Sequence, residues 1–241
     1  MRKSLQSVIL VLVLFSISSC EKEEVEYASS ANIYVINSAV DAGSVKVNAG
    51  ASSEFSYSKA TDLAFGSSAV YGSFKGTKTI TAVSSVDTTK SFFLRTINLE
   101  SVSTLYIAGM APNVDTLFRT ETNLPYISNS GSLTQDNSIY IRFVNLSPNS
   151  TPLNINIRLA TENEVTALPY KGISLFKKYV ALTTTPNYVF EVRDAATNTI
   201  QTTFTLPNST YRFKTISLVV KGLLGTTTGV NAFGVFVVSY T

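Results

Sequence analysis

A strict alternation of apolar and polar side chains is the dominant pattern of the chain from Asn32 onward. From Leu153 to Leu159 the apolar residues alternate with Asn and Arg, and from Ile200 to Leu206 they alternate mainly with Gln and Thr. Successive side chains of a β-strand point to opposite faces, so a period of two predicts half-buried strands. Segments rich in Val, Phe, Tyr and Thr predict further strands at 188–192, 211–220 and 233–240. Glu162 to Leu168 is the one segment whose pattern suits even a short helix.

The two halves of the chain carry similar features in the same order. Three pairs recur at a spacing of about 105 to 113 residues: Asn37 and Asn145 after a strand, Leu63 and Leu168, and Gly109 and Gly222. This spacing is the length of a whole domain, and about 100 residues suffice for a β-sandwich. We therefore expect an all-β protein of two tandem immunoglobulin-like antiparallel β-sandwich domains, at 31–123 and 138–241, with a linker at 124–137. The strand from Phe233 to Tyr240 is apolar on both faces, which predicts a central strand of the second sandwich.

The N-terminus has the three-part layout of a secretory signal. A basic start precedes an apolar run from Val8 to Phe15, which is far shorter than the roughly 20 residues that span a bilayer. The residues that follow, Ile17-Ser18-Ser19-Cys20, resemble the bacterial lipobox. We expect cleavage between Ser19 and Cys20 and lipidation of Cys20, which makes 1–19 a lipoprotein signal peptide. Two or three acyl chains hold a protein on a membrane durably.

Four carboxylates lie within the six residues after Cys20, so we interpret residues 20–30 as an acidic tether. The run also resembles a short acidic signal by which some Gram-negative bacteria export lipoproteins to the outer face of the outer membrane. We therefore expect a protein that is lipid-anchored in the outer membrane and faces the cell exterior. The inward-facing leaflet is the alternative.

The composition excludes several kinds of chemistry. The chain has no His and one Cys, which rules out histidine-based nucleophilic catalysis, His-containing zinc sites and an internal disulfide. The carboxylate pairs Glu162 with Glu164 and Glu191 with Asp194 are expected to be solvated, and Asp41 to Gly43 is expected to be a turn rather than part of a calcium site. We expect no catalytic residues, no metal and no cofactor, and hence no enzyme.

The charge balance argues against a nucleic-acid partner. The chain has 19 basic residues, of which Arg2 and Lys3 leave with the signal peptide, so 17 basic residues face 16 acidic ones. Lys177-Lys178 is the only basic doublet of the mature chain, and we expect it on a wet surface loop. An electrostatic DNA interface needs several phosphate contacts from one face.

Aromatic residues gather in the stretch from Leu168 to Tyr179. Loops on a rigid β scaffold often carry recognition, so Tyr170, Phe176 and Tyr179 are a candidate ligand loop. Stacking on sugars is one use of such rings, although packing is the more economical interpretation. Two triplets, Asp87-Thr88-Thr89 and Asp115-Thr116-Leu117, resemble a short bacterial O-glycosylation acceptor.

The opening hairpin of each half carries a resemblance to a known family. The segment from Ala31 to Val47, and the one from Ile141 to Ile155 with Asn145-Leu146-Ser147-Pro148, resemble domain-of-unknown-function family 4397. The first copy lacks the Pro of this motif. The resemblance implies secreted or lipid-anchored bacterial β domains that often occur in tandem, and it implies no catalytic residues.

These observations predict a non-enzymatic structural or binding module, held on the membrane by its lipid anchor, with an extracellular protein or glycan as partner. Two alternatives remain open. One is a fimbrial or adhesive assembly subunit, which would polymerise by donating a strand to an open sheet edge. The other is a glycan-binding accessory lipoprotein.

Overall fold

The computed structural model describes residues 29–50, 55–127 and 136–240. The predicted signal peptide, Cys20 and parts of the predicted tether and linker lie outside these ranges. Within them nearly all regular structure is strand, and the two short helices are η1 (Tyr57–Lys59) and α2 (Asn208–Tyr211). No helix in these ranges has the length and apolar character needed to cross a membrane. The prediction of an all-β protein is therefore confirmed at the level of fold class.

Two facing sheets form what we call the first sandwich. Sheet 1A has the spatial order β3 (Ser67–Phe74), β1 (Ser30–Asn37), β6 (Val102–Met110) and β7 (Asn113–Thr120). Sheet 1B has the order β2 (Val45–Ala49), β4 (Gly76–Ser84) and β5 (Ser91–Leu99). Alternate side chains of these strands, such as Ile33 and Val35 of β1, enter a core shared by both sheets.

The second sandwich has the same two-layer build. Sheet 2A has the order β11 (Lys177–Val180), β8 (Ser138–Asn145), β14 (Thr215–Lys221) and β15 (Gly234–Ser239). Sheet 2B has the order β10 (Asn163–Leu168), β9 (Leu153–Ile157), β12 (Tyr188–Asp194) and β13 (Ile200–Leu206). Ile139, Ile141 and Phe143 of β8 point into its core, where Phe143 meets Phe190 edge to face.

The matched residues of the two halves occupy the same places. In each A sheet the first strand of the sandwich pairs in parallel with the sixth or seventh, β1 with β6 and β8 with β14. The Nδ2 of Asn37 donates to the carbonyl of Leu63 at 3.0 Å, and the Nδ2 of Asn145 donates to that of Leu168 at 3.2 Å. Both amides therefore fasten the end of a central strand to a leucine that lies a few residues before the edge strand of the same sheet.

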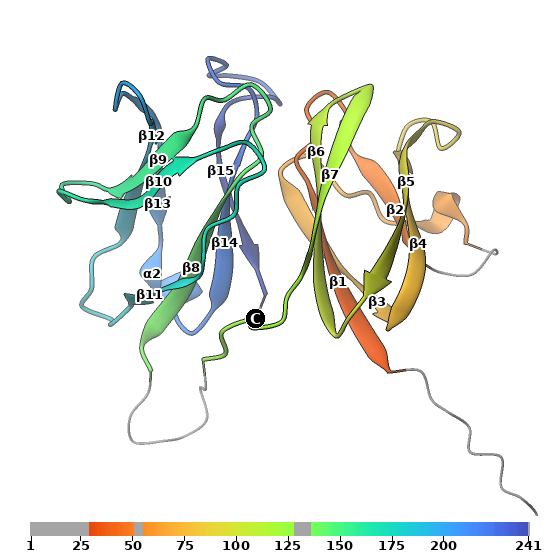
Figure 1. Ribbon diagram of the computed structural model, residues 1–241, viewed down its shortest axis with the longest axis horizontal. Helices are drawn as coiled ribbons and strands as arrows, with labels where there is room; N and C mark the ends of the chain where they lie inside the picture. The colour runs from red at the N-terminus through yellow and green to blue at the C-terminus, as the bar shows by residue number, and fades with distance from the viewer. Residues whose placement is uncertain (1–28, 51–54, 128–135, 241) are drawn as a thin grey trace, which may run out of the picture.

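The outer faces of sheets 1A and 2A pack against each other, so the two sandwiches stand side by side (Figure 1). A third apolar cluster fills this contact, with Ile36 and Tyr106 from the first sandwich and Val144, Val219 and Val238 from the second. We call this cluster the central contact.

Three local predictions are wrong. Glu162 to Leu168 does not form a helix, because Asn163–Leu168 pairs with β9 as strand β10. The alternation that starts at Leu153 ends at Ile157. The backbone of Leu159 has a φ of 69°, outside the strand region, and its side chain is 95% exposed. The last strand, β15, is an edge strand rather than a central one. It is apolar on both faces because one face lies on the second core and the other on the central contact.

We expect Gly222→Ala to destabilise the protein much more than Gly225→Ala. Both glycines have a positive φ, 80° and 88°, which disfavours any L side chain. A Cβ on Gly222 would lie 2.2 Å from the carbonyl oxygen of Ala232, whereas a Cβ on Gly225 would meet nothing within 4 Å. The overlap should add about 1–3 kcal/mol to the loss of unfolding free energy. Urea titrations of both variants measure the difference, and equal losses would contradict this account.

Candidate functional site

A fully buried arginine lies at the middle of the central contact. Arg142 is on β8, between Ile141 and Phe143, which point into the second core. Alternation along the strand therefore turns Arg142 to the other face, toward sheet 1A. Its side chain is 1% exposed. A charge at such a depth needs a partner and a full set of hydrogen bonds.

Glu121, the residue after β7, provides that partner. The Nη1 of Arg142 donates to Oε2 of Glu121 at 2.8 Å, and Nη2 donates to Oε1 at 2.5 Å. The geometry is the two-pronged arginine–carboxylate pair, which is stronger and more directional than a single contact. Thr104 also donates to Oε1 at 2.7 Å, and Nε of Arg119 lies 3.4 Å from Oε2. The ion pair therefore joins the two sandwiches.

Hydroxyl groups and aromatic rings complete the surroundings of the guanidinium group. Nε of Arg142 donates to the hydroxyl of Ser217 at 2.8 Å, and Nη2 donates to those of Tyr106 and Tyr240 at 3.0 and 2.6 Å. The ring of Phe176 lies 4.6 Å from the guanidinium carbon, close enough for a cation–π interaction.

The protonation states follow from these contacts. Burial would lower the pKa of Arg142, but the hydrogen bonds with Glu121, together with the electrostatic effect of Tyr106, Tyr240 and Glu121, outweigh burial and the pKa is raised. Burial also raises the pKa of Tyr106 far above its ordinary value. The arginine therefore stays charged and this tyrosine stays neutral at physiological pH, and neither is poised to exchange a proton.

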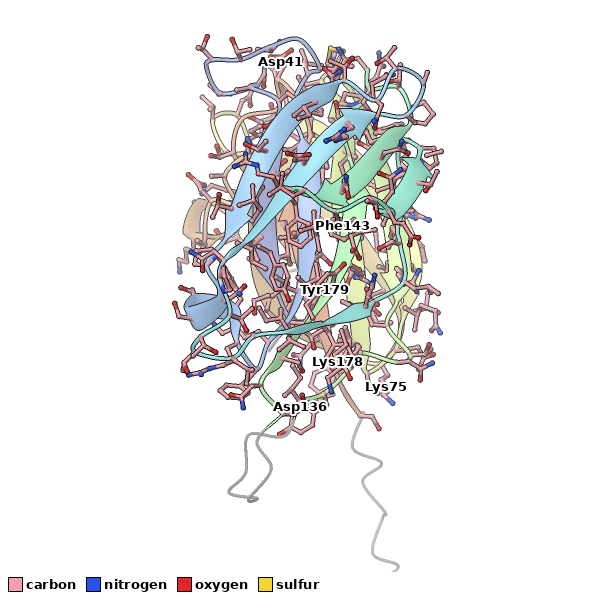
Figure 2. All side chains as sticks on the ribbon, turned by 90° about the vertical axis from the view of Figure 1, so that its left-hand side faces the viewer. Asp41, Lys75, Asp136, Phe143, Lys178 and Tyr179 are labelled. Carbon is pink, nitrogen blue, oxygen red and sulfur yellow. The ribbon has the colours of Figure 1, made fainter. Side chains whose placement is uncertain are left out.

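The candidate ligand loop lies partly inside this arrangement. Tyr170 and Phe176 are partly buried and pack on the central contact. Tyr179 is on β11 and 5% exposed, within the second core, and its hydroxyl donates to Oε2 of Glu164 at 2.7 Å. Figure 2 shows Tyr179 and Phe143 in the body of the second sandwich rather than at its ends. All three aromatic rings therefore take part in packing, as the simpler interpretation of the sequence expects.

A groove opens beside the ion pair, at the junction of the two sandwiches. It has a volume of about 320 Å³, and residues from both sandwiches and the segment between them line it: Arg119, Glu121, Pro125, Ser174, Leu175 and Phe176. Leu175 is exposed, and Arg119 keeps part of its guanidinium group in solvent. The groove therefore offers a cation and an apolar rim to a ligand, while the carboxylate of Glu121 is already occupied.

Three of the four carboxylates that the sequence singled out, Glu164, Glu191 and Asp194, are bound in local networks. Glu191 is not on a solvated surface as expected: it is buried at 4% exposure, with Nη2 of Arg193 at 2.5 Å and Nε of Arg158 at 3.3 Å. Glu164 pairs with Lys177 at 2.6 Å, whereas Glu162 is exposed. Within the described ranges no group of three or more His, Cys, Asp or Glu is placed to hold a metal ion.

Asp194 closes the turn after β12. Its Oδ1 accepts the backbone N–H groups of Ala196 and Thr197 at 3.0 and 2.8 Å, and its Oδ2 accepts the hydroxyl of Thr151. The hydroxyl of Thr151, followed by the groups of Thr197, lowers the pKa of Asp194 from 3.8 to about 2. Asp194 is therefore a structural anion.

The remaining predicted features lie at the ends and edges of the sandwiches. Lys177 and Lys178 are on edge strand β11 rather than on a loop, because they pair with Ile141 and Tyr140 of β8. Asp41 to Gly43 is a turn, as expected. Figure 2 shows Asp41 at the opposite end of the molecule from Asp136 and Lys178.

The two threonines of the acceptor-like triplets differ in exposure. Thr88 is exposed. Thr116 is partly buried, and its hydroxyl accepts a hydrogen bond from Arg95 at 2.7 Å.

Sequence reasoning missed Arg142 and Glu121. The alternation correctly places Arg142 on the polar face of its strand, but such a face is normally wet. One signal was available: Tyr34 takes the matching position in the first half, and an aromatic residue there hints that this face is covered.

Comparisons with known proteins add no relative to this picture. No family model matches the chain, and a search of the curated proteins finds no match. The resemblance to domain-of-unknown-function family 4397 therefore stays a prediction.

We expect Glu121→Gln to lower the free energy of unfolding by about 3 kcal/mol, because the change leaves the buried guanidinium of Arg142 without a counter-charge. The amide is nearly the same size as the carboxylate, so the loss reports charge rather than packing. Glu100→Gln is the matched control, since Glu100 is exposed and its carboxylate accepts a bond from Asn98. The control should stay within about 0.5 kcal/mol of the parent in denaturant titrations. Equal effects of the two changes would show that the ion pair contributes little.

We expect the difference in unfolding free energy between the parent and Asp194→Asn to depend on pH. The pKa of Asp194 is lowered on folding, so its contribution is present above pH 4 and disappears as the pH falls through about 2. Unfolding free energies of both proteins, measured between pH 2 and 6, should converge at the acid end. A difference that does not change with pH would contradict the assignment.

Proposed function

We propose that this protein is a lipid-anchored protein of the bacterial outer membrane that displays a rigid pair of β-sandwiches outside the cell as a non-enzymatic structural or binding module. The observation that carries the proposal is the single cysteine, Cys20, placed directly after Ile17-Ser18-Ser19 at the end of a short apolar run. The lack of His, together with a central charge cluster whose members are occupied by one another, supports a role without catalysis.

Contacts along the whole length of the two sandwiches support the rigid pairing. Nζ of Lys171 lies 2.6 Å from Oδ2 of Asp115, and the hydroxyl of Tyr34 donates to the carbonyl of Tyr240 at 2.7 Å. A large apolar contact with polar bonds around it holds two bodies in one orientation, whereas small polar contacts allow them to move. A fixed orientation suits a protein that presents a surface to partners.

We also propose that the two sandwiches are copies of one immunoglobulin-like domain, with the boundaries 31–123 and 138–241. Their A sheets share the order of strands and the parallel central pair. The paired roles of Asn37 and Asn145 support the same view.

The lipid anchor is tested by metabolic labelling with a clickable fatty acid in a Gram-negative host. We expect the parent and Ser19→Ala, which keeps a small residue before the cleavage point, to be labelled and to fractionate with membranes. Cys20→Ala should incorporate no label and should leave the membrane fraction. If Cys20→Ala fractionates like the parent, the anchor proposal is wrong.

External exposure is tested separately by protease treatment of intact cells. Peptides from both sandwiches should be released before lysis, while a periplasmic marker stays protected. Release only after lysis would place the protein on the inward-facing leaflet.

A further inference from the structure

Among the residues that the structure describes, no strand pairs with the outer edge of β3 in the first sandwich. β3 lies at one end of sheet 1A and pairs with β1 on one side. Its eight residues, Ser67 to Phe74, contain no charge and no proline. Natural proteins usually protect a long edge with charged residues, proline or a bulge, because unpaired backbone groups accept another strand.

The backbone groups of Val70, Gly72 and Phe74 point away from β1. The N–H of Lys75 donates to the carbonyl of Ser29 at 2.9 Å, which makes these two residues a hydrogen-bonded pair in the ladder. Hydrogen-bonded pairs alternate along an antiparallel ladder, so the odd-numbered residues of β3 bond to β1 and the even-numbered ones face outward. Val70 and Phe74 are also 54% and 55% exposed.

The second sandwich shows how the corresponding edge is protected. β11 takes the place of β3 beside β8, and it is only four residues long. It carries Lys177 and Lys178, which pair with Glu164 and Asp136 at 2.6 and 2.9 Å. The described edge strand β3 has neither of these protections, because it is eight residues long and carries no charge.

A groove runs beside the open edge. It has a volume of about 540 Å³ and is lined by Ala49, Gly50, Phe55 and the β3 residues from Val70 to Phe74. The groove therefore leaves the edge of β3 accessible from Val70 to Phe74.

Gly72 lies at the middle of the edge from Val70 to Phe74. A Cβ at this position would meet nothing within 4 Å, and its φ is one that other residues adopt. Neither packing nor backbone conformation within the chain requires a glycine here. A glycine inside a strand often marks a place where another backbone approaches closely.

We propose that a second copy of this chain docks on this edge, with the two β3 strands antiparallel about a two-fold axis at Gly72. In this register Val70 of each copy lies opposite Phe74 of the other, and Gly72 lies opposite Gly72. Val70, Gly72 and Phe74, three of the four residues whose backbone faces outward, then form hydrogen-bonded pairs, and the two exposed apolar side chains become aromatic–aliphatic cross-strand pairs. The uncharged edge matches itself without repulsion, which is why a second copy fits.

The test measures association of the full-length chain in detergent, with Cys20→Ser as background so that added cysteines are unique. Sedimentation across a concentration series should show a monomer–dimer equilibrium. Val70→Lys with Phe74→Lys should raise the dissociation constant roughly tenfold or more, because the register puts like charges opposite each other. Leu94→Lys is the matched control: Leu94 is 69% exposed, on edge strand β5 of sheet 1B, and the change should leave association unaltered.

A cross-link tests the register itself. Gly72→Cys puts two thiols on the two-fold axis, where paired strands bring Cα atoms within disulfide reach, so mild oxidation should give a covalent dimer. Leu94→Cys should give none. Circular dichroism establishes that each variant is folded. A folded parent that stays monomeric at every concentration, including one whose β3 binds a foreign peptide instead, overturns the proposal. So does dimerisation that Leu94→Lys abolishes and the β3 lysines do not.

Discussion

The packing of sheet 1A on sheet 2A determines how the rest of the molecule is arranged. Once these two outer faces meet, water is excluded from the polar face of β8, and Arg142 has to find its counter-charge on the other sandwich. The same packing covers the outer face of edge strand β15. It also fixes the segment after β7, because the hydroxyl of Thr215 donates to the carbonyl of Pro125 at 2.6 Å. The central contact thus combines apolar packing with a buried ion pair between the sandwiches.

The all-β class and the positions of most strands could be predicted because they depend on local pattern. A period of two reports which side chains share a face, and turn residues such as those after Asp194 mark where a strand ends. The paired asparagines could be matched for a similar reason. Asn37 and Asn145 make equivalent hydrogen bonds at the same point of each sandwich, and the same residue type stands at both positions.

The features that could not be predicted depend on partners far away in the chain. Asn163–Leu168 is a strand because β9 lies beside it, and nothing inside the segment records that neighbour. Glu191 is buried because Arg158 and Arg193 neutralise it. In the sequence Arg142 looks like an ordinary surface residue, because nothing near it in the chain indicates that sheet 1A, the third layer, covers the outer face of sheet 2A. The candidate ligand loop is partly covered for the same reason, since Tyr170 and Phe176 pack on that layer, although Phe176 also lines the groove beside the ion pair.

Side-by-side packing also has a consequence for how the molecule could meet a target. Nδ2 of Asn231, in the loop before β15, donates to Oδ1 of Asp41, in the loop after β1, at 2.6 Å. This bond ties loops of both sandwiches together at the end opposite the start of β1 (Figure 1). Two sandwiches joined end to end would present their tips at different heights. Here the tips of both sandwiches lie at one end of the molecule and are tied together, so a body that reaches one tip also meets the other.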